Sequence, residues 1–517
     1  MDRFVPRFLY DRYIRFRIWR RDFSFDDWDA ERVFKTSLYL TEWLLQIILL
    51  ALFWLFIIPP IMDNDFFVGE ELGEVIREFV LVCTRPTVKG FIILISSAVA
   101  LNLLFNFILR CRRLTSRQYH VMSATIGYVL LQINCNAKSM VVIMVFMLII
   151  FLLVNRLKVF VERDRQIIRP VYTITLILTT ILCLGEFFFP YERVWEGSRA
   201  IMMVMTMKVI SISTDDYCLK RITTVELVGY LLCPASVLFG PWMSMDTYTL
   251  NNVHRQKLSA KWFTQTIQAF TYAMAHMILS NCLVQSITPI SDAFYIPMKW
   301  HEALRNSFAF RSSNYCTGYM AEFTMLTAGF NAYQHYDEEQ RWDYPVARPS
   351  NIECPRSMAV VLKNWNIPAY RFFKDCVYSP FSEINYVCGL TMTFVLALLL
   401  NGFNARMMLI LLTMGILSYS QEIIQDKLAY WFDCCCCVNP CDDECEHRFG
   451  PWNPITLIIN GFNMVINVSH LAYLGYVMDR KFERTTIYEL YEIWEDEFGV
   501  QTHFLMLVWW ATMLFIS

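Results

Sequence analysis

Four polar side chains stand inside otherwise apolar stretches of the sequence, where they could bind a substrate or exchange protons. They are His276 in YAMAHMILS, Glu322 in YMAEFTML, Asn401 in LALLLNGFN and His470 in NVSHLAYLG. A charged side chain at the middle of a bilayer costs at least ~2.5 kcal/mol, so such residues need a reason to be there. Imidazole and carboxyl groups can exchange protons, whereas a carboxamide only forms hydrogen bonds. For each residue alone, the simplest alternative is a hydrogen bond between helices, worth under ~1 kcal/mol.

The cysteine-rich segment CCCCVNPCDDECEH, residues 434–447, is a second group with chemical potential. Cys437, Cys441, Cys445 and His447 could form a Cys₃His zinc site, although their spacing is not a common zinc-finger pattern. The cysteines could instead carry lipids near a membrane surface, or simply pack. The sequence leaves these alternatives open. We expect any reaction that the protein catalyses to use no metal or other cofactor.

The elements that position these residues must lie in a membrane. Of the 517 residues, 56% are hydrophobic and only 18% are charged, and the mean hydropathy is +0.36. About a quarter of the residues in a soluble domain are charged. The net charge of −2 lacks the basic excess of a nucleic-acid-binding protein, so we expect no nucleic-acid partner. The composition predicts an all-α, polytopic membrane protein.

Apolar runs separated by polar segments predict about nine to twelve membrane helices. Several runs are shorter than the ~20 residues that a full span needs, so some are expected to be re-entrant or broken. The runs are Ser37–Pro60, Gly90–Leu109, Tyr119–Cys135, Ser139–Val154, Pro170–Pro190, Arg199–Ser213, Glu226–Trp242, Phe263–Val284, Tyr315–Phe330, Tyr386–Leu400, Met407–Tyr419, Ile455–Tyr476 and Phe504–Ile516.

Charge predicts how the runs are oriented, because positively charged loops stay in the cytosol. The first 21 residues hold seven arginines and no apolar core of a cleavable signal peptide. The segments 110–117 and 156–169 are also basic, whereas 63–78 is acidic. A cytosolic N-terminus with alternating runs places every basic segment inside and the acidic segment on the lumenal side.

We divide the chain into three regions, the last of which begins where the motifs described below begin. Residues 1–36 form a basic cytosolic N-terminus, and 37–225 hold the N-terminal transmembrane helices. Residues 226–517 form a core that includes a polar loop, 334–366, and the cysteine-rich loop, 434–447. The polar loop is rich in Trp, Pro and charge, so we expect it to be ordered and functional. A transporter or channel would also have many helices, but the charges in these runs are few and form no evident ion path.

Six motifs follow one another through the third region, and their order and residues resemble the membrane-bound O-acyltransferase family. The resemblance runs from about Glu226 to the C-terminus, while the N-terminal third matches only in hydropathy. The motifs are FGPW (residues 239–242), NYCTGYMAEFTML (314–326), RWDYPVARPSNIECPRSM (341–358), NWNIPAYRFFKDCVY (364–378), LLLNGFN (398–404) and SHLAYLGYVMD (469–479).

The resemblance implies helices around an intramembrane reaction tunnel, an acyl-CoA donor and a hydroxyl acceptor. The motifs are most similar to those of members that transfer palmitoleate from palmitoleoyl-CoA to a serine of Wnt proteins in the endoplasmic reticulum membrane. The acyl-CoA would then enter from the cytosol and the protein acceptor from the lumen. Residues in the matched motifs are expected to line or support the substrate site: Asn314, Glu322, Asp343, Arg348, Arg356, Trp365 and His470.

The two most characteristic residues of the family are an Asn in a WN-(I/L)-P motif and a His in LLHGF, thirty-five positions later. The Asn corresponds to Asn366, but the His position holds Asn401. Imidazole can take the proton of the attacking hydroxyl, because its pKa lies near working pH. A carboxamide cannot, and losing a positioned base removes about 10²–10⁴ in rate.

The departure at Asn401 leaves a second hypothesis, a catalytically silent relative that binds lipid or Wnt. No histidine lies between His335 and His447, so no neighbour in the sequence replaces the missing one. His470 matches a separate family motif and is the alternative base.

Overall fold

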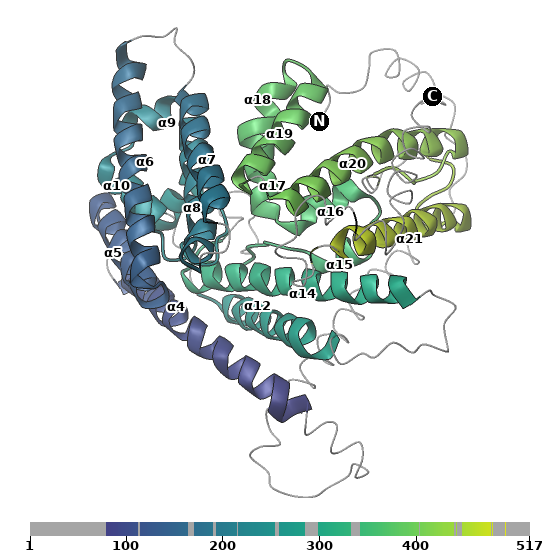
Figure 1. Cartoon of the computed structure of the whole chain (residues 1–517), viewed down its shortest axis with the longest axis horizontal. Helices are drawn as coiled ribbons and strands as arrows, with labels where there is room; N and C mark the ends of the chain where they lie inside the picture. Colours follow the sequence, from purple (N-terminus) through teal and green to yellow (C-terminus); the bar gives the residue numbers. More distant parts are fainter. Residues whose placement is uncertain are drawn as a thin grey trace, which may run out of the picture. The chain divides into compact units, whose positions relative to one another are not determined.

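We describe the protein from a computed structural model of the chain (Figure 1). The described residues belong to one compact unit, Ile58–Ser517. They are residues 79–111, 114–163, 170–189, 193–214, 216–253, 258–284, 298–331, 342–402, 404–438, 441, 447–476, 478 and 492.

Every named element in these ranges is helical, which confirms the predicted all-α fold class. The elements are η2 (Phe79–Thr84), α4 (Arg85–Cys111), α5 (Ser116–Asn134), α6 (Ala137–Arg163), α7 (Pro170–Phe188), α8 (Arg193–Ser213), α9 (Asp216–Arg221), α10 (Thr224–Leu231), α11 (Met245–Val253), α12 (Ala260–Ile278), η3 (Leu279–Leu283), α14 (Met298–Thr327), α15 (Pro349–Glu353), α16 (Met358–Trp365), α17 (Ile367–Phe373), η4 (Lys374–Tyr378), α18 (Ser379–Ser382), α19 (Tyr386–Leu400), α20 (Ala405–Phe432) and α21 (Pro454–Tyr476), where η marks a π-helix.

Five described helices are long and apolar enough to cross a membrane. They also carry outward-facing apolar side chains, such as Phe187 on α7 and Ile458 on α21, which are 78% and 72% exposed. Such exposure is favourable in lipid and costly in water. The protein is therefore a multi-pass membrane protein. The predicted runs Ser37–Pro60 and Phe504–Ile516 lie outside the described residues, and α19 is a shorter apolar helix. The five spans are Leu81–Cys111, Ala137–Val159, Val171–Phe188, Arg406–Phe432 and Pro454–Tyr476.

One predicted run is not a continuous helix. The run Glu226–Trp242 contains α10, which ends at Leu231, and continues as turns. Pro234 explains the break, because proline disfavours helical conformation in the residue before it and offers no N–H. The predicted polar loop also differs from expectation, since its described part contains two helices, α15 and α16.

Helix α14 is the central support of the C-terminal half. It packs against α12 on one side and α21 on the other (Figure 1). The carbonyls at its C-terminal end accept hydrogen bonds from other helices, 2.8 Å from Trp262 Nε1 to Leu326 O and 2.9 Å from Asn106 Nδ2 to Thr327 O. Carbonyls at a helix end have no partner within the helix, so these bonds fix α14 in place.

Helices α5 and α10 meet at their backbones. Ser123 Oγ on α5 donates a 2.8 Å hydrogen bond to the carbonyl of Gly229 on α10. One turn further along α5, a Cβ built on Gly127 would lie 1.6 Å from the carbonyl oxygen of Leu232. Small residues allow this close approach, as is common between helices in membranes.

Gly127→Ala is therefore expected to destabilise the protein by about 1–3 kcal/mol, the usual cost of overpacking. Gly461→Ala on α21 is the matched control, because a Cβ there meets nothing within 4 Å and alanine favours helix by about 1 kcal/mol. Apparent melting temperatures of the purified proteins in detergent measure the difference. Equal melting temperatures for the two variants would contradict the close packing of α5 on α10.

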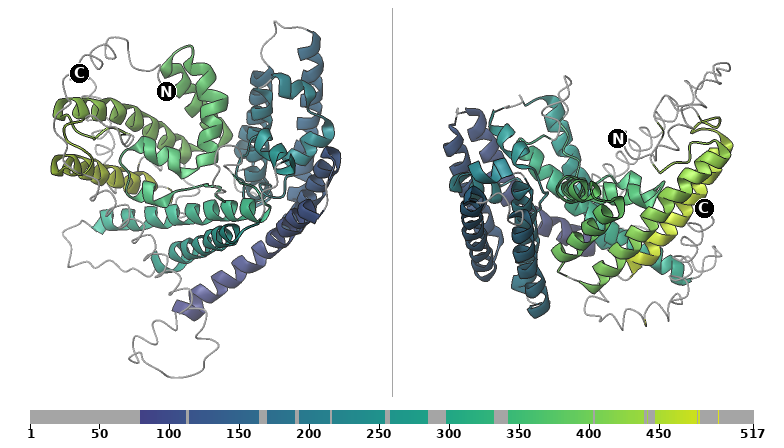
Figure 2. Two further views of the ribbon diagram at one scale, coloured as in Figure 1. Left: turned by 180° about the vertical axis from the view of Figure 1, so that it is seen from behind. Right: turned by 90° about the horizontal axis from the view of Figure 1, so that it is seen from above.

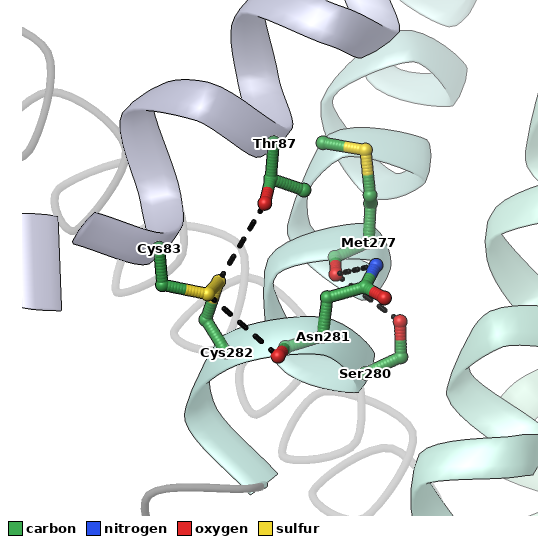
Figure 3. Close-up of a disulfide and its surroundings, with 6 residues drawn as sticks. All are labelled: Cys83, Thr87, Met277, Ser280, Asn281 and Cys282. Atoms are coloured by element: carbon green, nitrogen blue, oxygen red, sulfur yellow. Dashed lines mark hydrogen bonds between the residues drawn. A yellow bond between two sulfur atoms is a disulfide. The ribbon is translucent and has the colours of Figure 1, made fainter. Parts of the chain in front are cut away.

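A disulfide joins Cys83 of η2 to Cys282 of η3 and ties the start of α4 to the end of α12 (Figure 3). Thr87 Oγ1 lies 3.9 Å from the Cys282 sulfur. Disulfides persist in oxidising compartments such as the lumen of the endoplasmic reticulum. The acidic segment 63–78, which charge places on the lumenal side, directly precedes η2 but lies outside the described residues. The disulfide is consistent with that orientation.

Candidate active site

Asn366 lies at the junction of two helices. It ends α16 and begins α17, in an extended conformation. Its Oδ1 accepts a 3.1 Å hydrogen bond from the backbone N–H of Ala369. This is an ordinary N-terminal cap, followed by Pro368 in the first turn, where its missing N–H costs nothing. The side chain is exposed, and its Nδ2 makes no hydrogen bond to the described residues.

The segment before α15 runs alongside this junction. The backbone N–H of Ile367 donates to Val346 O at 2.8 Å, and that of Arg348 donates to Asn364 O at 3.1 Å. These two bonds hold the WNIP motif against the segment that carries Asp343 and Arg348. Two motifs that the sequence separates by about twenty residues are thereby neighbours.

Three of the predicted site residues form one charged cluster. Arg348 Nη2 lies 3.0 Å from both carboxylate oxygens of Asp343, and Arg348 Nη1 lies 3.6 Å from Glu322 Oε2. Glu322 comes from α14 and is only 5% exposed. The backbone N–H of Asp343 donates to Asn331 Oδ1 at 3.3 Å. One guanidinium therefore compensates two carboxylates, which suits a rigid support better than a cation kept for a phosphate.

A second ion pair, partly buried, lies close by and was not predicted. Arg311 of α14 makes a two-point contact with Glu353 of α15, with N–O distances of 2.8 and 2.9 Å. Tyr315 donates from its hydroxyl to the same carboxylate at 2.6 Å. The four-residue spacing of Arg311 and Tyr315 places both on one face of α14, a signal that the sequence does contain.

Trp365 connects this ion pair to Asn366. Its ring lies 6.2 Å from Phe310 in a stacked arrangement and 6.4 Å from Tyr315, edge-on. Such contacts favour a fixed ring orientation. Trp365, the residue before Asn366, therefore packs against aromatic side chains of α14.

His276 of α12 packs against the opposite side of these aromatics. Its ring stacks on Tyr319 at 5.7 Å and meets Tyr315 edge-on at 5.3 Å. Its buried Nδ1 makes no hydrogen bond to any described residue. This histidine is therefore an imidazole near the WNIP motif, because it and Trp365 both contact Tyr315.

Asn401 closes α19 and lies in a different set of contacts. Its Nδ2 donates to Ala397 O at 2.8 Å, and its carbonyl accepts from Arg199 Nη2 at 2.8 Å. Arg199 also pairs with Glu186 at 3.3 Å, and Glu186 accepts from Trp195 Nε1 at 2.8 Å. This network holds the end of α19 against α7 and α8. The resemblance implies that Asn366 and Asn401 face one reaction cavity. No hydrogen bond joins the two residues, so this placement stays a prediction.

The remaining predicted site residues lie apart from the charged cluster. Asn314 is half-buried on α14, and His470 Nδ1 donates to Ile466 O on α21 at 2.8 Å. Arg356 donates to the carbonyl of Cys435 in the cysteine-rich loop. Its predicted role in substrate binding stays a prediction, and its observed contact is with that loop.

The cysteine-rich loop brings together part of the predicted zinc set. Cys435, Cys441 and His447 have ligand atoms within 4.8 Å of one another. Two of the four predicted ligands are present in this group, Cys435 was not predicted, and Cys445 lies outside the described residues. The thiol of Cys437 is near that of Cys441. Burial raises the pKa of Cys437 to about 12.

Comparison with known proteins gives relatives over much of the chain, although no family model matches it. Three curated relatives are named protein-serine O-palmitoleoyltransferase porcupine. The mouse protein is 27% identical and the human protein 26% identical, each over 345 residues that cover 62% of this chain and 72% of the relative. The Anopheles gambiae protein is 25% identical over 437 residues, 78% of this chain and 86% of the relative. The chain, with its helical membrane fold, is therefore similar to porcupine proteins over much of its length.

Proposed function

We propose that this chain transfers palmitoleate from palmitoleoyl-CoA to a serine of Wnt proteins, in the membrane of the endoplasmic reticulum. The observation that carries the proposal is the similarity to protein-serine O-palmitoleoyltransferases over most of the chain. The acyl-CoA is taken up from the cytosolic side and the Wnt acceptor from the lumenal side.

In this reaction the serine oxygen attacks the thioester carbonyl carbon, the bond from carbon to sulfur breaks, and an oxygen ester forms. The hydroxyl proton leaves by way of a base and ends on the CoA thiol. Negative charge develops on the carbonyl oxygen during the attack, and a positioned N–H stabilises it. Asn366 suits this second role, because its Oδ1 is held by the helix cap while its Nδ2 makes no hydrogen bond to the described residues.

The residues around Asn366 are arranged to hold the WNIP motif in place. The ion cluster of Glu322, Asp343 and Arg348 fixes the segment that hydrogen-bonds to the WNIP motif. Trp365 and its aromatic neighbours offer an apolar surface to the acyl chain. Asn314 and His470 complete the predicted substrate-binding set.

The second candidate function is that of a silent relative that binds acyl-CoA or Wnt without turnover. Asn401 is the observation that favours it, because the family histidine is replaced and the carboxamide Nδ2 is bonded to Ala397 O. The two candidates differ only in whether a base is present, so they share the same binding partners.

Transfer of palmitoleate from its CoA thioester to a Wnt serine peptide, in membranes that contain the full chain, tests the proposal. Asn366→Ala should lower the initial rate by about ten- to a hundredfold, the equivalent of one hydrogen bond to a charged group. Asn366→Asp is the matched variant, because it keeps the capping oxygen and replaces the Nδ2 donor with a charged carboxylate oxygen. Its rate should fall at least as far as that of Asn366→Ala, while its melting temperature stays close to that of the parent.

The same measurements are repeated with Asn401→His as the parent chain. If neither parent chain transfers palmitoleate while both still bind acyl-CoA, the enzyme proposal is wrong and the chain is the silent relative. Transfer that is indifferent to Asn366 would remove this residue from the mechanism.

A further inference from the structure

The loop between α20 and α21 holds three metal-binding side chains at one point. Cys435 Sγ and Cys441 Sγ each lie 3.7 Å from His447 Nδ1. The three ligand atoms all lie within 4.8 Å of one another, with Cys435 buried and the other two half-buried. They come from positions spread over thirteen residues, so the fold has to bring them together.

Backbone hydrogen bonds bring the two ends of the loop side by side. Cys435 N–H donates to Phe449 O at 3.0 Å, and Phe449 N–H donates to Asp433 O at 2.9 Å. Asp433 ends α20 in a left-handed conformation, φ 48°, which turns the chain sharply. Cys435 and His447 are therefore placed by backbone bonds that need no metal.

The neighbouring cysteines serve a different purpose. Cys434 and Cys436 are fully buried and form a small apolar cluster with Ala429, with Phe449 packed against it. A hydrogen bond of 2.8 Å from Cys436 N–H to Cys434 O turns the chain at Cys435. Cys434 Sγ and Cys436 Sγ lie 3.0 Å apart, while Cys435 Sγ lies near His447.

The distances match those of a tetrahedral zinc site. With Zn–S near 2.3 Å and Zn–N near 2.0–2.1 Å, tetrahedral geometry places a sulfur and a nitrogen ligand about 3.6 Å apart. Both observed sulfur–nitrogen distances are 3.7 Å. Thiolate and imidazole ligands in this geometry favour zinc over the harder cations. The described residues supply these three ligands.

We propose that Cys435, Cys441 and His447 bind a structural zinc ion, which holds the loop between α20 and α21. This proposal does not rest on the proposed acyl transfer.

The loop also supports the segment that leads to the WNIP motif. Arg356, just before α16, donates to Cys435 O, while its own carbonyl accepts from Gln425 Nε2 of α20 at 2.9 Å. Figure 2 shows α20 and α21 side by side, and Gln421 Nε2 donates to Asn467 Oδ1 between them. A zinc ion would brace both helices and, through Arg356, the start of α16.

The test is the metal content of the full chain, purified in detergent without chelator or affinity metal. Elemental analysis should find about one zinc per chain. Cys435→Ser, Cys441→Ser and His447→Ala should each bring the zinc content near background. Cys434→Ala is the matched control, because it removes a neighbouring thiol that packs away from the site, and it should keep the metal.

A second measurement does not depend on variants that fold. Exchange of the wild-type protein with cobalt should give the thiolate-to-metal charge-transfer band and the intense visible bands of a tetrahedral site, and a strong chelator should lower the melting temperature. Wild-type protein without zinc, or variants that keep it, would overturn the proposal. A disulfide or an attached acyl chain at Cys435 or Cys441, found by peptide mass spectrometry, would overturn it as well.

Discussion

Replacing Asn401 by histidine is expected to raise the rate of acyl transfer by about two to four powers of ten, the usual contribution of a positioned base. The geometry at the end of α19 explains why. Asn401 Nδ2 donates to Ala397 O at 2.8 Å, and the Nδ1–H of a histidine has a similar reach. A backbone carbonyl on Nδ1–H fixes the tautomer and leaves Nε2 as the proton acceptor.

The pH dependence of this variant has a definite sign. Only neutral imidazole accepts a proton, so the rate should rise with pH through the pKa of the new histidine, ordinarily near 6.5. The affinity for acyl-CoA should change little, because asparagine and histidine are both polar and similar in reach. Initial rates of palmitoleate transfer to a Wnt serine peptide across a pH series measure the pH dependence. The same rates at varied acyl-CoA concentration measure the affinity.

Asn401→Gln is the control, since it keeps a carboxamide at the same position and should bring no gain in rate. An unmodified chain as fast as Asn401→His would mean that another residue is the base. His470 and His276 are then the side chains to remove, singly and together.

Arg311→Met is expected to destabilise the protein by about 1–3 kcal/mol, the usual cost of leaving a hydrogen-bonding group without its partner, because Glu353 is only partly buried. Glu353 would keep its charge and lose both contacts from the guanidinium. The melting temperature of the purified protein in detergent should fall accordingly. Lys363→Met is the matched control, because Lys363 is an exposed cation on the neighbouring helix α16.

The double variant Arg311→Met with Glu353→Gln separates the charge from the packing. It should recover part of the lost stability, because the uncompensated carboxylate is gone, and the two changes should not be additive. A single variant as stable as the Lys363→Met control would mean that this ion pair is not buried in the membrane-embedded protein.

The sequence predicted the fold class because long apolar runs have few stable alternatives in lipid. It also selected Glu322, Asp343 and Arg348, which the fold brings into one cluster. The sequence did not predict the ion pair of Arg311 and Glu353. Its partners are forty-two residues apart, and Arg311 lies outside the six motifs.

In the cysteine-rich loop the predicted zinc ligands and the described cluster share only Cys441 and His447, and zinc binding stays a prediction. The predicted set included Cys437, whereas the described cluster contains Cys435. Spacing alone could not distinguish them, because the choice depends on backbone bonds from Cys435 and Asp433 to Phe449. The break at Pro234 has a local cause and was readable from the sequence.

The disulfide between Cys83 and Cys282 sets an order on the biosynthesis of the protein. Its partners are 199 residues apart in the sequence, so Cys83 is translated long before Cys282. During that interval its thiol has to stay reduced, or be released from wrong partners by thiol–disulfide exchange. The bond joins the segment before α4 to the end of α12. It can therefore form only after the residues between Cys83 and Cys282 have been translated.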